Sequence, residues 1–79
     1  MPTPVTLPDL GLDTDERIAV SAWLASPGDF VIEGDRLVEV LTTAATFDVS
    51  APATGRLASV VVYPDDRLET GQVLGWIDQ

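Results

Sequence analysis

The sequence predicts an all-β domain: a flattened β-barrel or sandwich made of two small antiparallel sheets related by a pseudo-two-fold axis. Short apolar, β-branched runs alternate with turn residues along the whole chain, and one pattern repeats at a spacing of 37 residues. No segment shows the apolar period of an α-helix over a useful length. We expect residues 1–79 to form a single domain, and the start at Met1 and the end just past Ile77 fit a freestanding unit.

The strands are expected at residues 5–7, 18–24, 30–32, 37–41, 46–49, 57–62, 68 and 73–77. Prolines flank the first of these, so it should lie at a sheet edge or end early. Pro27 and Pro64 should initiate turns, and Gly34, Gly55 and Gly71 should be turn residues with unusual φ angles. Between the expected strands the chain is rich in turn residues, as an all-β fold requires.

The repeat divides the chain into two similar halves. Each half has the pattern of a strand, a Pro-x-Asp turn, a very short apolar segment, a Gly turn and a second strand. The matched pairs include Pro27 with Pro64, Asp29 with Asp66, Gly34 with Gly71, Leu37 with Leu74, and Val40 with Ile77. Neither half can bury its apolar face alone, so the halves should pack face to face. The hairpin that ends the first half should then lie opposite the chain termini.

The tip of that hairpin carries only weakly reactive side chains. Residues 42–45 form the expected turn between the strands at 37–41 and 46–49, and Thr43 and Ala44 stand at its end. The turn contains no Gly or Asn, so a type I geometry is expected. Such a hairpin is suited to presenting a side chain to a partner, although neither Thr43 nor Ala44 has much reactivity.

Charge and composition exclude several classes of function. Thirteen acidic residues stand against four basic ones, all arginines, which gives a net charge of −9. Nucleic-acid binding is not expected without a basic patch, and no apolar run is long enough to span a membrane. The N-terminus has no signal-peptide pattern, so we expect a cytoplasmic protein. The acidity serves either solubility or docking onto a basic partner surface.

The missing residue types narrow the chemistry further. With no His or Cys, the usual metal ligands and nucleophile–base pairs are absent, and with no Lys a cofactor cannot be attached to a lysine amine. Residues 13–16 begin like a calcium-binding loop, but the pattern fails at Arg17, Ile18 and Leu24. We therefore expect no metal site.

Catalysis has equally few candidates. The acidic pairs Asp13/Asp15 and Asp65/Asp66 are the only acid–base groups to consider, and turn carboxylates usually cap or are solvated. We therefore do not expect an enzyme. Trp23 and Trp76 are expected to pack in or beside the core.

Nearly the whole chain resembles the biotinyl/lipoyl domain family, in particular the lipoyl domain of dihydrolipoyl acyltransferases of 2-oxo acid dehydrogenase complexes. The segments that are similar to the family are residues 5–11 at the opening, the W-x-x-x-P-G-D pattern from Trp23 to Asp29, E-G-D-x-L-x-E-V from Glu33 to Val40, and the later turns at residues 51–55 and 71–74. The resemblance implies a flattened all-β fold, with a lysine at the hairpin tip that carries lipoate.

The tip departs from that family pattern. Where the family reads Glu-Thr-Asp-Lys-Ala, this chain reads Leu41-Thr42-Thr43-Ala44-Ala45, which places Ala44 at the attachment position between Thr43 and Ala45. The resemblance therefore implies lipoate as the family cofactor, and the residues imply that this chain holds none. We expect a non-covalent binding or assembly module with a protein partner, possibly in a 2-oxo acid dehydrogenase-type complex. The alternatives are a lipoyl carrier domain whose lysine was replaced or lost, and a purely structural accessory domain.

Overall fold

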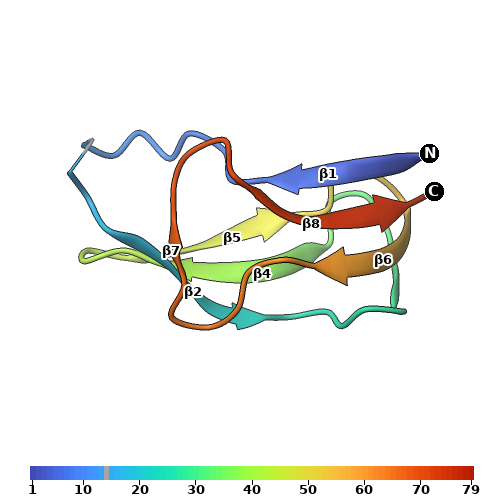
Figure 1. The fold of residues 1–79 in the computed structure, drawn as a ribbon. Coiled ribbons are helices and arrows are strands. Elements are labelled where there is room, and N and C mark those ends of the chain that lie inside the picture. The colour runs from blue at the N-terminus through green and yellow to red at the C-terminus, as the bar shows by residue number, and fades with distance from the viewer. Residues whose placement is uncertain (14) are drawn as a thin grey trace.

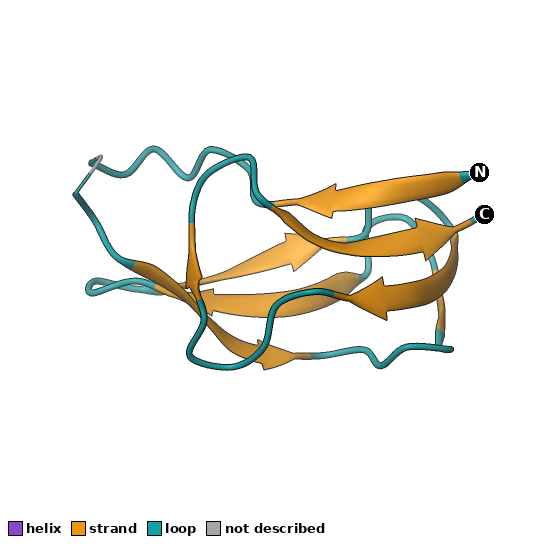
Figure 2. Cartoon of the chain, in the orientation of Figure 1, coloured by secondary structure: helices purple, strands orange, loops and turns teal. Residues whose placement is uncertain are grey.

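The protein is built from eight short strands. A computed structural model describes residues 1–13 and 15–79, and no helix occurs among these residues (Figure 2). The strands are β1 (Pro2–Thr6), β2 (Ile18–Trp23), β3 (Phe30–Val31), β4 (Arg36–Leu41), β5 (Thr46–Ser50), β6 (Gly55–Val60), β7 (Arg67–Leu68) and β8 (Val73–Asp78). The expected all-β class is confirmed, and within the described residues there is no helix that could cross a membrane.

The strands form two antiparallel four-stranded sheets, ordered β1-β8-β6-β3 and β5-β4-β2-β7. The described strands of one sheet do not pair with those of the other, so the fold is a sandwich and not a closed barrel. The molecule is elongated, with extents of 34 × 19 × 18 Å. The β4–β5 hairpin lies at one end and both termini lie at the other, as the repeat predicted (Figure 1).

The two halves share their pairing register residue by residue. Equivalent cross-strand partners, shown as first half and then second half, are Val20–Val40 and Leu57–Ile77, Ala22–Glu39 and Ser59–Trp76, and Trp23–Val38 and Val60–Gly75. Even the irregularity recurs, because one bulge lies between Val20 and Ala22 and the other between Leu57 and Ser59. The predicted pseudo-two-fold relation therefore extends to the hydrogen-bonding pattern.

The fourth strand of each sheet comes from a different part of the chain. β5 follows β4 directly, whereas β8 pairs with β1 from the opposite end of the sequence. The registers still coincide, because Phe47 pairs with Val40 as Thr3 pairs with Ile77. β1 lies at a sheet edge, as its prolines predicted, although it begins at Pro2 and ends before Leu7.

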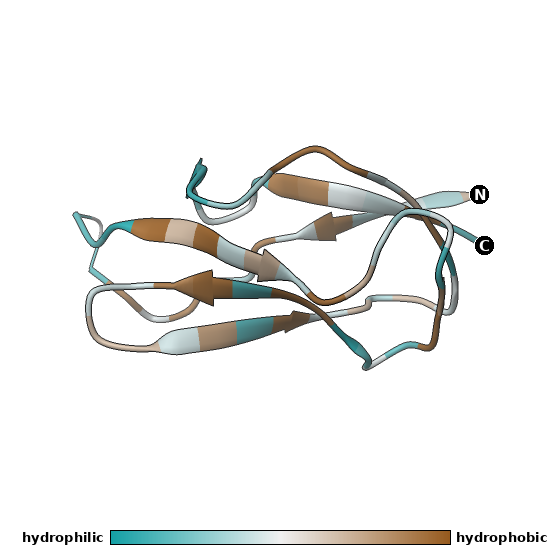
Figure 3. Cartoon of the chain, turned by 90° about the horizontal axis from the view of Figure 1, so that it is seen from below, coloured by the Kyte–Doolittle hydropathy of each residue, from teal (hydrophilic) through white to brown (hydrophobic). Residues whose placement is uncertain are grey.

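The core lies between the sheets and draws on both. Figure 3 shows apolar segments along the strands, with hydrophilic residues between them, and further apolar segments in some of the loops. The largest side chains that are almost completely buried are Leu7, Leu37, Leu57, Leu74 and Ile77. Three of these are leucines on β4, β6 and β8. The buried residues of both halves belong to one core cluster, so the two halves bury their apolar faces together, as the repeat required.

Glycine conformation agrees with the sequence at two of the three expected positions. Gly34 and Gly71 have φ angles of 96° and 86° and occupy equivalent turns. Gly55 was expected to do the same, and this is wrong: it is a buried residue at the start of β6 without a positive φ. A Cβ at Gly55 would clash with the carbonyl oxygen of Asp78, so close strand packing, and not a turn, explains this glycine.

Candidate functional site

The candidate site is the tip of the β4–β5 hairpin. Regular antiparallel pairing extends along the hairpin from Val38–Val49 to Leu41–Thr46. The ladder closes at the tip, where the Thr42 N–H donates to the Ala45 carbonyl at 2.8 Å. The two sequence-predicted strands thus place the turn at one end of the sandwich (Figure 1).

Thr42 is the structural residue of the tip. Its hydroxyl oxygen accepts from the N–H groups of Ala44 and Ala45 at 3.2 and 3.1 Å and donates to the Ala45 carbonyl at 3.0 Å. The residue is only 6% exposed, which corrects the expectation that all of residues 42–45 would be presented outward. The Thr42 side chain is therefore turned inward onto its own turn and is not presented to solvent.

Thr43, Ala44 and Ala45 are exposed at the tip, as expected. None of these residues has a positive φ angle, which agrees with a turn that contains no Gly or Asn. The side chains they present carry three methyl groups and one hydroxyl. Such a surface supplies contacts and a hydrogen bond but no nucleophilic amine, thiolate or imidazole.

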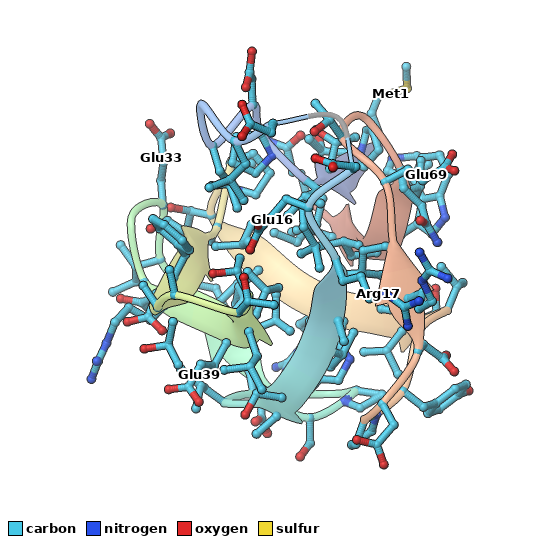
Figure 4. The ribbon with its side chains drawn as sticks, turned by 90° about the vertical axis from the view of Figure 1, so that its left-hand side faces the viewer. Met1, Glu16, Arg17, Glu33, Glu39 and Glu69 are labelled. Atoms are coloured by element: carbon cyan, nitrogen blue, oxygen red, sulfur yellow. The ribbon has the colours of Figure 1, made fainter. Side chains whose placement is uncertain are left out.

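The loop between β1 and β2 reaches the tip through Glu16. One carboxylate oxygen of Glu16 accepts from the Thr43 N–H at 3.1 Å and also from the Thr43 hydroxyl. Figure 4 shows Glu16 on the side of the hairpin, while Arg17 lies on the opposite side of β2. In the sequence, Glu16 stands out only as the last residue of the calcium-like segment, and no motif links it to a residue 27 positions away.

Apart from Glu16, no other candidate residue is hydrogen-bonded to the tip among the described residues. The calcium-like segment includes Thr14, which lies outside the described residues, and no grouping of metal-ligating side chains occurs among the residues that are described. Asp66 caps its turn by accepting from the Tyr63 N–H at 2.8 Å, as expected of a turn carboxylate. Trp23 is half-buried against the core, and Trp76 is also half-buried.

Comparisons with known proteins point to one family. A biotin/lipoyl family model, described as "Biotin-requiring enzyme", matches residues 3–77. The dihydrolipoyllysine-residue acetyltransferase component of the acetoin cleaving system of Pseudomonas putida is 37% identical over 89% of this chain and 19% of its own length. The dihydrolipoyllysine-residue succinyltransferase component of the 2-oxoglutarate dehydrogenase complex of Bacillus subtilis is 28% identical over 95% of this chain and 18% of its own length.

A solved structure matches the fold. The solution structure of the lipoyl domain of the 2-oxoglutarate dehydrogenase complex from Azotobacter vinelandii superposes with a TM-score of 0.72 and 22% identity, and the match covers 95% of this chain and 96% of that one. The chain spans less than a fifth of the length of the two acyltransferase components described above. The match to the solved structure therefore concerns the architecture of one domain.

Proposed function

This chain belongs to the biotinyl/lipoyl domain family, and from that premise we propose that it is a lipoyl-type domain that binds protein partners without carrying a covalent cofactor. The proposed setting is a 2-oxo acid dehydrogenase-type complex, because its relatives are named as acyltransferase components of such systems. The proposed role is assembly or recognition, not catalysis by the domain itself.

The observation that carries the proposal is the chemistry available at the tip. Attachment of lipoate or biotin in amide linkage requires an amine, and the sequence contains no lysine. We align Ala44 with the attachment position, where an exposed methyl group cannot form an amide. The remaining amine, at the N-terminus of Met1, lies at the opposite end of the molecule (Figure 1). The residues present therefore do not fit a covalently held lipoyl or biotinyl group.

The tip is well formed despite this loss. Thr42 closes the turn from below and Glu16 holds Thr43 from the side, so Ala44 is presented in a defined geometry. A hairpin that had lost its reactive residue and had no other role would not require the hydrogen bonds from both Thr42 and Glu16. The ordered tip favours a surface that a partner recognises by shape and hydrogen bonding.

A ligase assay tests the first half of the proposal. The chain is incubated with lipoate–protein ligase, lipoate and ATP, and its intact mass is measured. We expect no mass increase for the wild type. The double variant Thr43→Asp with Ala44→Lys supplies the Asp-Lys pair of the family tip and should gain one lipoyl group. A lipoylated wild-type chain would overturn the proposal, and a double variant that refuses lipoate would show that recognition by the ligase was lost elsewhere as well.

A capture experiment tests the second half. Purified components of a 2-oxo acid dehydrogenase complex are passed over the immobilised chain, with the Ala44→Arg variant as a matched surface control. Saturable binding to a component, weakened at least about tenfold by the bulky tip substitution, is expected of an interface centred on this residue. Absence of binding to every component would contradict the assembly role and would favour a carrier domain whose lysine was replaced or lost.

A further inference from the structure

The two sheets have four edge strands, and three of them are blunted. β3 and β7 are only two residues long, and β1 carries Pro2 and Pro4. Very short strands and prolines are the usual means by which a sheet edge avoids pairing with another chain. The fourth edge, β5, is five residues long and contains no proline.

The open main-chain groups of β5 belong to Thr46 and Asp48. The hairpin bond from Thr42 to Ala45 directs the polar groups of Ala45 toward β4. In a regular antiparallel pair these directions alternate residue by residue, so Thr46 and Asp48 direct their N–H and C=O groups away from β4. Both residues are exposed. The side chain of Asp48 is only 31% exposed, less than the residue as a whole, so part of the exposed surface of Asp48 is main chain.

The internal symmetry supplies a comparison within the same molecule. Pro2 and Pro4 on β1 are the counterparts of Thr46 and Asp48 on β5. The Gln79 N–H reaches the Met1 carbonyl, so alternation likewise places the nitrogens of Pro2 and Pro4 on the outer edge of β1. The edge of one sheet therefore lacks donors at the two positions where the edge of the other offers them.

The charge beside β5 restricts what can pair with it. Asp48 lies opposite Glu39 on β4, and Arg36 contacts Asp48 at 3.3 Å, so these three side chains beside β5 carry a net charge of one negative unit. A second copy of this chain would bring another net charge of −9 to the edge and is disfavoured. A basic strand is favoured because opposite charges on neighbouring strands attract.

We propose that β5 is a docking edge that takes up an extended segment of a partner protein, with a lysine or arginine beside Asp48 and apolar residues on either side of it. The apolar neighbours would point toward the core side, where Phe47 is only half-buried and packs against the core. Main-chain hydrogen bonds to Thr46 and Asp48 supply the affinity, and the basic residue supplies the selectivity. The inference rests on the proposed non-covalent binding role and names the chemistry of the partner.

The probe is a short capped peptide with the pattern Thr-Val-Lys-Val-Thr, titrated into the isotope-labelled chain and followed by amide chemical shifts. We expect saturable shifts centred on Thr46 and Asp48, and weaker binding when glutamate replaces the lysine of the peptide. Thr46→Pro copies the arrangement of β1 and should weaken binding at least about tenfold, since it removes a donor and adds a blocking ring. The matched control Thr46→Val keeps the N–H and should bind like the wild type.

The outcomes separate this inference from the proposed function. Shifts located away from β5, or equal binding by Thr46→Pro and Thr46→Val, would overturn the docking edge. If the proline variant does not fold, Asp48→Asn decides instead, because it keeps the donor and should abolish the preference for lysine over glutamate in the peptide. Capture of a dehydrogenase component that is insensitive to Thr46→Pro would leave the proposed function standing without this edge. Peptide pairing at β5 without capture of any dehydrogenase component would support the docking edge and contradict the proposed function.

Discussion

At the scale of single residues, the hydroxyl of Thr42 forms three hydrogen bonds within the turn, more than any other side chain at the tip. Replacing Thr42 by Val keeps the shape of the side chain but removes all three bonds. We expect Thr42→Val to lower the free energy of unfolding by about 1–3 kcal/mol, measured by urea denaturation. Thr42→Ser keeps the hydroxyl and should lose much less. Equal losses in the two variants would mean that the methyl group, and not the hydroxyl, stabilises the turn.

Asp65 is a second residue whose conformation can be tested. Its φ angle is 74°, and its counterpart in the first half is Gly28 with a φ of 97°. The left-handed region is unfavourable for residues with a Cβ, and Asp tolerates it better than Ala. We expect Asp65→Ala to destabilise the protein by about 1 kcal/mol and Asp65→Gly to remain within about 0.5 kcal/mol of the wild type. Thermal unfolding of both variants checks this order, and a more stable Ala variant would contradict it.

The residues at the tip also show where sequence reasoning reached its limit. Exposure of Thr43, Ala44 and Ala45 could be predicted because two β-branched strands flank a short polar centre. The burial of Thr42 and the contact from Glu16 could not, since each depends on where a side chain points after the loop has folded. Residue type and spacing do not predict the direction in which these two side chains point.

At the scale of elements, Trp23 connects the two sheets. It is the last residue of β2, and its indole N–H donates to the carbonyl of Val62, just beyond β6 in the other sheet, at 2.9 Å. Trp23→Phe leaves that carbonyl without its partner, and we expect a loss of about 1–3 kcal/mol in unfolding free energy. Trp76→Phe is the control, because the indole of Trp76 forms no hydrogen bond within the described part of the chain. Equal losses in the two variants would contradict a bridging role for Trp23.

The strand order could be predicted only in part from the repeat. The 37-residue spacing relates β2, β3 and β4 to β6, β7 and β8, and the structure confirms each equivalence through its register. The equivalence of β5 and β1 is absent from that spacing, because β1 enters from the other end of the chain. Gly55 was misassigned for a related reason: its neighbour across the sheet is a strand that is distant in sequence.

At the scale of the whole molecule, the excess of acidic residues acts on stability and on binding in opposite directions. The thirteen acidic residues outnumber the four basic ones, so repulsion outweighs attraction within a molecule only 34 Å long. Unfolding increases the distances between these charges, so self-repulsion favours the unfolded chain. The same charges attract a basic partner surface over a range of roughly 10 Å at 0.1 M salt.

Salt should therefore raise the stability of the free domain and weaken its docking. Over roughly 0.01 to 1 M sodium chloride the screening length falls from about 30 to 3 Å, so both effects should be mostly suppressed at the upper end. We expect the thermal midpoint to rise and the association rate with a basic partner or peptide to fall across the same buffers, measured by calorimetry and stopped-flow mixing. Asp48→Asn should reduce the salt dependence of association, because it removes the charge nearest the docking edge. A thermal midpoint that falls with salt would show that favourable ion pairs such as Arg36–Asp48 outweigh the general repulsion.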